Sequence, residues 1–143
     1  MYSLLVYIHI LSAIGSIGPL LVMLVMLGKM KKAEESILAG YVQSFQSCID
    51  VVRYAGHVVV ISGALLVIFS GWSWSSSWIV LTLIVLAGSL VFLAKAFKPT
   101  MKTFGTPHFD RAYFMHKLEK NTRIYIGLLL IILLLMVVKP IVW

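Results

Sequence analysis

Residues 78–102 read WIVLTLIVLAGSLVFLAKAFKPTMK, an apolar run that ends among the basic residues Lys95, Lys98 and Lys102. A helix that crosses a membrane needs roughly 20 predominantly apolar residues, and this run is long enough. Basic residues beside a span are retained on the cytoplasmic side of the membrane. The stretch therefore predicts a transmembrane helix over about 78–97 whose carboxyl end lies inside.

Three further apolar runs, at about 3–28, 55–71 and 124–142, have the same character. The chain of 143 residues is 61% hydrophobic and only 12% charged, whereas a typical soluble domain is ~25% charged. The four runs take up more than half of the chain and leave no independent soluble domain. We predict a single membrane domain over residues 1–143, an all-α four-helix transmembrane bundle with cytoplasmic segments at 29–54 and 98–123.

The charged and aromatic residues predict the orientation of this bundle. Eleven of the twelve Lys and Arg residues lie in or beside the two cytoplasmic segments, and only Lys139 lies elsewhere. All four tryptophans fall at the opposite ends of the predicted helices, where indole suits the membrane interface. These signals predict an N-out, C-out protein of the bacterial plasma membrane, with a retained first span rather than a cleaved signal. Topology and contact with anionic lipid headgroups explain the net charge of +7, so nucleic-acid binding is not expected.

Helices 2 and 4 are expected to continue into the cytoplasm. Apolar residues recur at helical spacing over 33–54, so the second helix is predicted to run unbroken from about 34 to 71. Thr106-Pro107 predicts the start of the fourth helix, and Lys98-Pro99 predicts the end of the third. The short outer loop at 72–77 predicts a tight antiparallel hairpin of helices 2 and 3.

Polar side chains within the hydrocarbon are energetically expensive, so they mark candidate sites. His9 lies about six residues into the first span, and Ser12 and Ser16 follow it on one helical face. We interpret these three residues as a candidate cofactor- or ligand-binding set. The alternative is that His9 is only hydrogen-bonded to a neighbouring helix or to interfacial water. None of the five carboxylates lies within a span, which argues against an ion- or proton-coupled transporter.

His57, near the inner start of the second span, is the other candidate cofactor-binding residue. With Arg53 one turn earlier, it suits an anionic headgroup, a haem or a quinone, or it is an interface histidine. The predicted spans place His9 and His57 roughly 20 Å apart along the membrane normal, too far for both to ligate one haem. His108 and His116 are interpreted as residues of one solvated helix face. No metal site is predicted.

Short motifs give the chain a resemblance to small bacterial membrane proteins. The motifs are His9 with the small residues that follow it, Ser62-Gly63 in the second span and Lys98-Pro99 after the third. They are similar to those of an uncharacterised integral membrane family and, more distantly, of copper-resistance protein D and the HemJ-type protoporphyrinogen oxidases. In HemJ-like proteins a first-helix His and a third-helix Lys are associated with haem and porphyrin chemistry. The resemblance implies these roles for His9 and Lys95.

Together these observations predict a small multi-pass membrane protein that is accessory or ligand-binding rather than enzymatic. Haem or another hydrophobic ligand is expected to bind through His9. The first alternative is a HemJ-like redox enzyme that acts on a porphyrin or a quinone, and the second is a lipid- or protein-interaction scaffold. The expected partners are the bilayer, anionic headgroups at the inner face, and a second copy of the chain or a partner membrane subunit.

Overall fold

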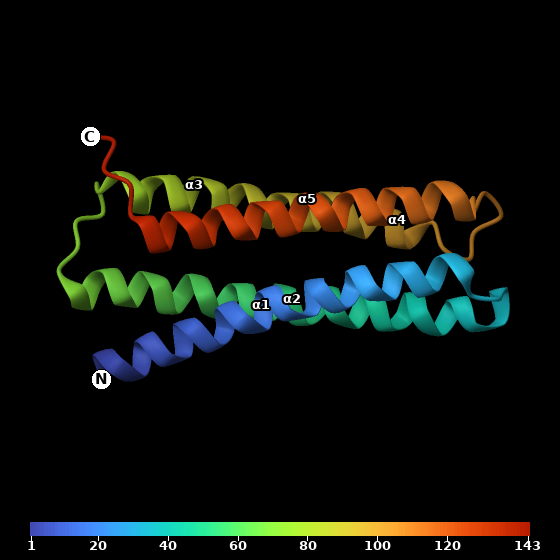
Figure 1. Ribbon diagram of the computed structural model, residues 1–143, viewed down its shortest axis with the longest axis horizontal. Helices are drawn as coiled ribbons and strands as arrows, with labels where there is room; N and C mark the ends of the chain where they lie inside the picture. The colour runs from blue at the N-terminus through green and yellow to red at the C-terminus, as the bar shows by residue number, and fades with distance from the viewer.

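A computed structural model describes residues 1–143 and contains helices without strands. Four helical stretches are long and apolar enough to cross a membrane, which confirms the predicted all-α, four-helix class. Figure 1 shows them as an elongated bundle of antiparallel rods. In chain order the elements are α1 (Tyr2–Lys32), α2 (Glu35–Ser70), α3 (Ser77–Phe92), the π-helix η1 (Leu93–Phe97), α4 (Lys98–Lys102) and α5 (Arg111–Val138).

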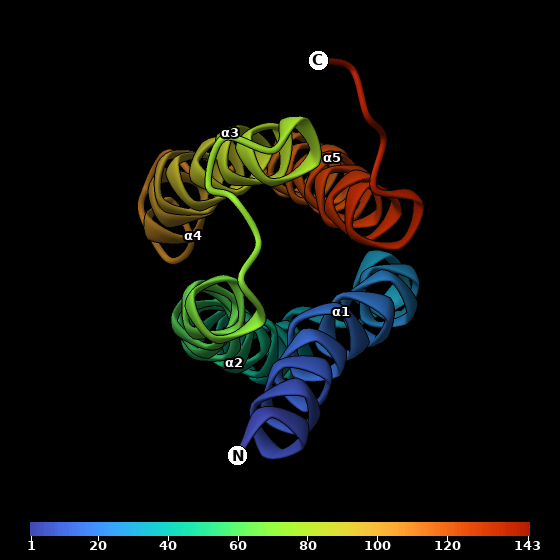
Figure 2. The same cartoon turned by 90° about the vertical axis from the view of Figure 1, so that its left-hand side faces the viewer.

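The bundle is built from two helical hairpins rather than from a ring of four evenly packed helices. One hairpin pairs α1 with α2, and the other pairs α5 with the rod formed by α3, η1 and α4, as Figure 2 shows. The hairpins meet mainly through α1 and α5. Close approach within the first hairpin is possible because Gly15 faces Ala55, where an added Cβ would lie 3.5 Å from the Cβ of Ala55.

The predicted tight hairpin of helices 2 and 3 is wrong. These helices are antiparallel, but they hardly contact each other, because residues 71–76 cross from one hairpin to the other. Gly71, with a φ of 73°, ends α2 in the left-handed conformation and turns the chain away. A short loop sets the direction of the next helix. It does not determine which helix the side chains pack against.

The hydrophobic core lies toward the end of the bundle that holds Lys32, Glu35 and Arg111, which we call the inner end after its predicted orientation. The helix α2 has 36 residues and is about 54 Å long at 1.5 Å per residue, which confirms that it runs unbroken over about the predicted range. The helix α1 accompanies α2 to this end, so the extension is packed rather than isolated. The fully buried residues that pack there include Met23, Met30, Phe45, Phe97, Phe114 and Leu118.

Three predicted helix boundaries differ from the structure. The N-cap of α5 is Asp110, whose carboxylate accepts from the backbone N–H groups of Ala112 and Tyr113, so Thr106-Pro107 does not start that helix. An Asp cap satisfies free N–H groups directly, and this outweighs the preference of proline for a first turn. Pro99 does not end the third rod, since it lies in the first turn of α4, where a missing N–H is tolerated. The fourth span ends at Val138 rather than at 142.

The π-helix η1 joins α3 to α4 where the third rod meets α5. Its Ala96 carbonyl accepts hydrogen bonds from Thr100 Oγ1 at 2.9 Å and from Asn121 Nδ2 at 3.1 Å. A wider helical turn leaves backbone carbonyls without their usual partners. Asn121 of α5 therefore ties the third rod to its partner helix at this irregular turn.

Candidate ligand groove between the hairpins

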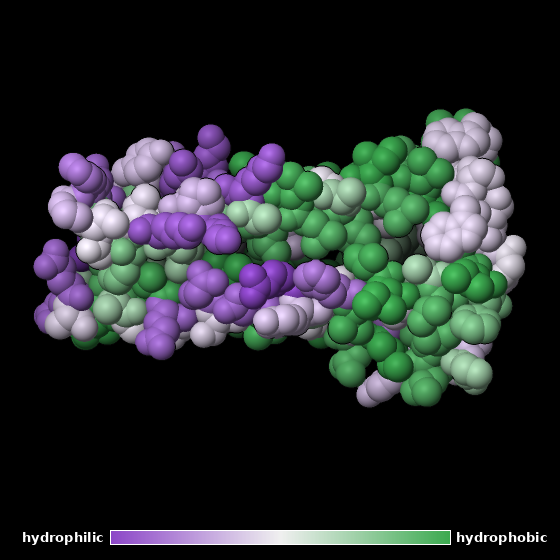
Figure 3. All heavy atoms as spheres, turned by 180° about the vertical axis from the view of Figure 1, so that it is seen from behind, coloured by the Kyte–Doolittle hydropathy of each residue, from purple (hydrophilic) through white to green (hydrophobic).

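A groove runs between α2 and α3 because the two hairpins do not close against each other along this side. Two cavities occupy it, of about 490 Å³ toward the outer end and about 620 Å³ toward the inner end. Figure 3 shows this face, with hydrophobic side chains over the outer half and hydrophilic ones over the inner half. The groove is therefore amphipathic along its length.

The outer cavity is walled mainly by apolar side chains of all four helices. Tryptophans gather at its mouth, where Lys139 lies 4.9 Å from the ring centre of Trp72 and 5.5 Å from that of Trp78. A cation over an aromatic face is stabilised by the ring quadrupole. This contact gives a local reason for the one basic residue outside the two cytoplasmic segments.

His9 is the one histidine that lines the outer cavity. Its Nδ1 lies 2.9 Å from Ser62 Oγ on α2. The Ser62 hydroxyl proton is directed to the Val58 carbonyl oxygen at 2.6 Å, so Ser62 accepts and His9 Nδ1 donates. In the neutral imidazole, Nε2 then carries the free lone pair. The ring also lies against the backbone of Val59. With Nδ1 directed to Ser62, Nε2 is the nitrogen available to a ligand.

Gly63 explains how the imidazole fits against α2. A Cβ at this position would lie 3.1 Å from His9 Cε1, closer than carbon atoms normally approach. Glycine therefore provides the space that lets His9 reach Ser62 in the same turn. The Ser62-Gly63 pair, first noticed as a motif of the second span, has a physical role as the seat of His9.

The other two residues of the predicted set lie beside His9 but face different surroundings. Ser12 Oγ donates to the His9 carbonyl oxygen at 2.9 Å, and Ser16 Oγ donates to the Ser12 carbonyl oxygen at 3.0 Å. Of the two, only Ser16 is buried, and it lines a small central cavity rather than the outer one. Each hydroxyl thus has its hydrogen-bond partner within α1, and neither serine lines the outer cavity that His9 lines.

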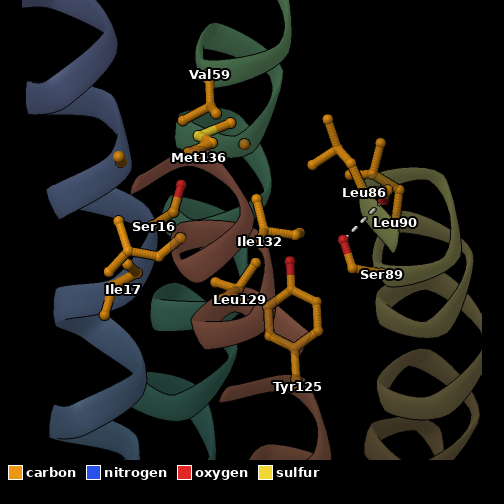
Figure 4. Close-up of a pocket in the computed structure, with 13 residues that line it drawn as sticks. Ser16, Ile17, Val59, Leu86, Ser89, Leu90, Tyr125, Leu129, Ile132 and Met136 are labelled. Carbon is orange, nitrogen blue, oxygen red and sulfur yellow. Dashed lines mark hydrogen bonds between the residues drawn. The ribbon is translucent and has the colours of Figure 1, made fainter. Parts of the chain in front are cut away.

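The central cavity, of about 50 Å³, contains a polar group that the sequence did not reveal. Tyr125 of α5 is 2% exposed, and its hydroxyl makes no hydrogen bond within the protein. Figure 4 shows this hydroxyl directed into the space beside Ile132 and Ser89. Tyr125 was missed because it opens an almost wholly Leu, Ile and Val segment. A lone phenol in such a segment was the available signal.

His57 lies nearer to the inner end of α2 than Ser62 does, and it lines the inner cavity. Since His9 contacts Ser62, only five residues from His57, the two histidines are separated by about 8 Å along the helix axis. The predicted 20 Å is wrong. The predicted separation was based on the hydropathy boundaries of the spans. In the structure, the α1–α2 turn at Ala33-Glu34 determines which residues of the two helices lie at the same height along the bundle axis. His57 is nevertheless exposed, and its Nδ1 lies 2.6 Å from the Arg53 carbonyl oxygen, so the two imidazoles serve different cavities.

The remaining candidates lie outside the groove. Lys95 is exposed on η1 and lines none of the three cavities, whereas Lys98 and Lys102 do line the inner one. His108 precedes the first residue of α5, so it does not share a helix face with His116 as expected.

Comparison with known proteins bears on the first three spans. The chain matches, over residues 3–103, a family described as "Predicted integral membrane protein (DUF2269)". No curated protein and no solved structure matched. The matched range covers all of α1 but its first residue and the whole of α2, α3, η1 and α4, and therefore both sides of the groove and His9 with its partner Ser62. The chain belongs to this family of integral membrane proteins.

Proposed function

We propose that the protein binds a hydrophobic ligand in the outer half of the groove, with His9 Nε2 as the polar anchor. The observation that carries the proposal is the contact between His9 Nδ1 and Ser62 Oγ. It holds one imidazole nitrogen within the protein and leaves the other to an apolar cavity of about 490 Å³. Ligand sites of this size are mostly apolar, with few placed polar groups.

Haem is the ligand that this arrangement suits best. An imidazole that ligates a metal almost always donates its second nitrogen to an oxygen, which fixes the ring and its tautomer. Ser62 meets this requirement for His9, and the surrounding wall is apolar enough for a porphyrin ring. A bound haem would supply one-electron or oxygen chemistry, while this chain would hold it and exclude water.

The resemblance to copper-resistance protein D and to HemJ-type proteins supports haem as the first ligand to test. It supports binding more than catalysis, since Lys95 is exposed outside the groove. We therefore propose an accessory, ligand-binding role in a bacterial plasma membrane.

A quinone is the second candidate ligand, and Tyr125 is the observation that favours it. Its side chain is buried, and its hydroxyl makes no hydrogen bond and opens into the central cavity, whose volume of about 50 Å³ admits only the edge of a quinone ring. A phenol in that state is a hydrogen-bond donor for a carbonyl oxygen. Saturable quinone binding that Tyr125→Phe weakens, together with no saturable haemin binding to the native chain, would support this ligand over haem.

The experiment is a haemin titration of the detergent-purified protein, followed through the Soret absorption. We expect saturable binding to the native chain. Ser62→Ala should weaken it about 10- to 100-fold, the usual effect of removing a group that orients a metal-binding histidine. The exposed residue His108 provides a matched control, and His108→Ala should bind as the native chain does. Absence of a saturable shift of the Soret band would remove the haem proposal, and equal binding by Ser62→Ala would remove the orienting role of Ser62.

A further inference from the structure

The inner cavity of the groove has a chemistry of its own, which does not depend on His9. Arg53 and His57 of α2 lie on one side, and Lys98 and Lys102 of α4 lie on the other. No carboxylate belongs to its wall. Asp50 binds Arg53 at 2.9 Å from the same helix, but Lys98 and Lys102 form no ion pair. The cavity, of about 620 Å³, therefore retains positive charge from both hairpins.

Depth relative to the outer end places this charge at the level of the inner headgroups. Arg53 is 17 residues from Ser70 at the outer end of α2, or about 26 Å. Lys98 is 21 residues from Ser77 at the outer end of α3, or about 32 Å. The hydrocarbon core of a bilayer is about 30 Å thick. The basic groups of the cavity thus coincide with the phosphate layer of one leaflet.

Apart from Gln46, the rest of the inner cavity is apolar. Ile49, Leu90, Leu93, Phe97 and Met101 contribute to its wall. Leu90 also lines the central cavity, which shares Val59 and Leu86 with the outer one. Apolar wall therefore continues from the basic cluster toward the outer half, between hairpins that do not pack together here. An apolar wall adds nothing to the binding of a small soluble anion, whereas an acyl chain would bury its apolar surface against it.

We propose that the inner cavity binds an anionic phospholipid, with its phosphate at the basic cluster and an acyl chain along the groove. Lys98 and Lys102 supply unpaired ammonium groups, and Arg53 adds a guanidinium. His57 Nδ1 lies 2.6 Å from the Arg53 carbonyl oxygen, which holds the imidazole beside the basic cluster. The lipid joins the two hairpins where protein side chains leave them apart.

The test measures retention of phosphatidylglycerol against phosphatidylcholine by the full chain, using native mass spectrometry of protein from mixed nanodiscs. The native chain should retain phosphatidylglycerol preferentially. Each basic residue near anionic lipid contributes about fivefold to binding, so K98Q/K102Q should reduce the preference about 25-fold. The control K29Q/K95Q removes the same charge from exposed residues outside the cavity and should reduce it by less than fivefold.

Three results would overturn the proposal. They are no preference for phosphatidylglycerol in the native chain, equal losses of preference in both double variants, or complete displacement of the retained phosphatidylglycerol by inorganic phosphate. The last would assign the cavity to a soluble anion. If K98Q/K102Q does not fold, Lys102→Gln alone should show about a fivefold loss, and an unchanged preference would contradict the site. Because His9 is native in every variant, failure here leaves the haem titration unaffected.

Discussion

At the scale of single residues, Gly63 is the position on which the seat of His9 depends most. We expect Gly63→Ala to displace the imidazole, since the new Cβ would lie 3.1 Å from His9 Cε1. Overpacking of this kind costs about 1–3 kcal/mol. Thermal unfolding in detergent should show the loss, and haemin affinity should fall with it.

Gly40 on the same helix is the matched control for Gly63. A Cβ there would meet nothing within 4 Å, and alanine is favoured over glycine by about 1 kcal/mol in a helix interior. Gly40→Ala should therefore leave stability equal or slightly higher. If both substitutions had the same effect, Gly63 would have no special relation to His9.

Glu119, in the segment predicted to be cytoplasmic, predicts a pH dependence of stability. The hydrogen bond from Lys31, followed by the charges of Lys31 and Arg123, lowers the pKa of the Glu119 carboxyl below its usual value. A lowered folded pKa stabilises the protein above the unfolded pKa, and this stability is lost as pH falls through the folded pKa. Because the partners are exposed, Glu119→Gln should cost only about 0.5–1 kcal/mol at pH 7.

The measurement for Glu119 is thermal unfolding of native and Glu119→Gln protein at pH 7 and below pH 4. The difference between them should shrink at the lower pH. Glu35→Gln, which removes a carboxylate without an ion pair, is the control and should show little difference at either pH. A gap for Glu119→Gln that persists in acid would mean that the ion pair is not its cause.

At the scale of elements, Arg111 connects the two hairpins at their turns, joining the start of α5 to the carboxyl end of α1. Its guanidinium donates to the carbonyl oxygens of Met30, at 2.8 Å, and Ala33 at the carboxyl end of α1. A hydrogen bond to a charged group contributes about 1.5–3 kcal/mol. A cation at the carboxyl end of a helix also interacts favourably with the helix dipole. Arg111→Met should destabilise the protein by about 2 kcal/mol, measured by thermal unfolding.

Lys120→Met serves as the control for Arg111, because Lys120 is an exposed cation of α5 without an ion pair. It should change stability by less than about 0.5 kcal/mol. Comparable losses in the two variants would show that total charge, rather than the cap of α1, is responsible.

The elements were predictable from sequence wherever the physics is local. Apolar length predicted the four helices, and helical periodicity over 33–54 predicted the extension of α2. The turn at 72–77 predicted direction but not pairing, because pairing depends on contacts such as Gly15 with Ala55 that no local pattern encodes. His9 was identifiable as a polar residue in an apolar run. Its partner Ser62, the level of His57 and the isolation of Tyr125 required the alignment of α1, α2 and α5.

At the scale of the whole molecule, the inner end is a packed four-helix core and the outer half is open between the hairpins. The basic residues accordingly fall into two groups with different contacts. At the inner end Arg111 and Lys31 join the hairpins, while Lys98 and Lys102 face the groove. A protein built in this way is stabilised at its inner end and is accessible to ligands along the groove between the hairpins.

The predicted orientation of the molecule is tested by cysteine labelling in a Cys48→Ser background. A membrane-impermeant maleimide applied to whole cells should label S75C but not S47C, and both should react after lysis. Both positions are exposed, at opposite ends of the bundle. The reverse pattern would place the basic end outside and would contradict the retention of basic residues in the cytoplasm.

The proposed function depends most on His9 Nε2, the atom proposed to bind the ligand. The most direct measurement is the Soret spectrum of His9→Gly protein with haemin, recorded before and after addition of imidazole. The account predicts no native-like band in the variant alone, and recovery of the band when free imidazole occupies the space left beside Ser62. A native-like band in His9→Gly without imidazole would contradict it.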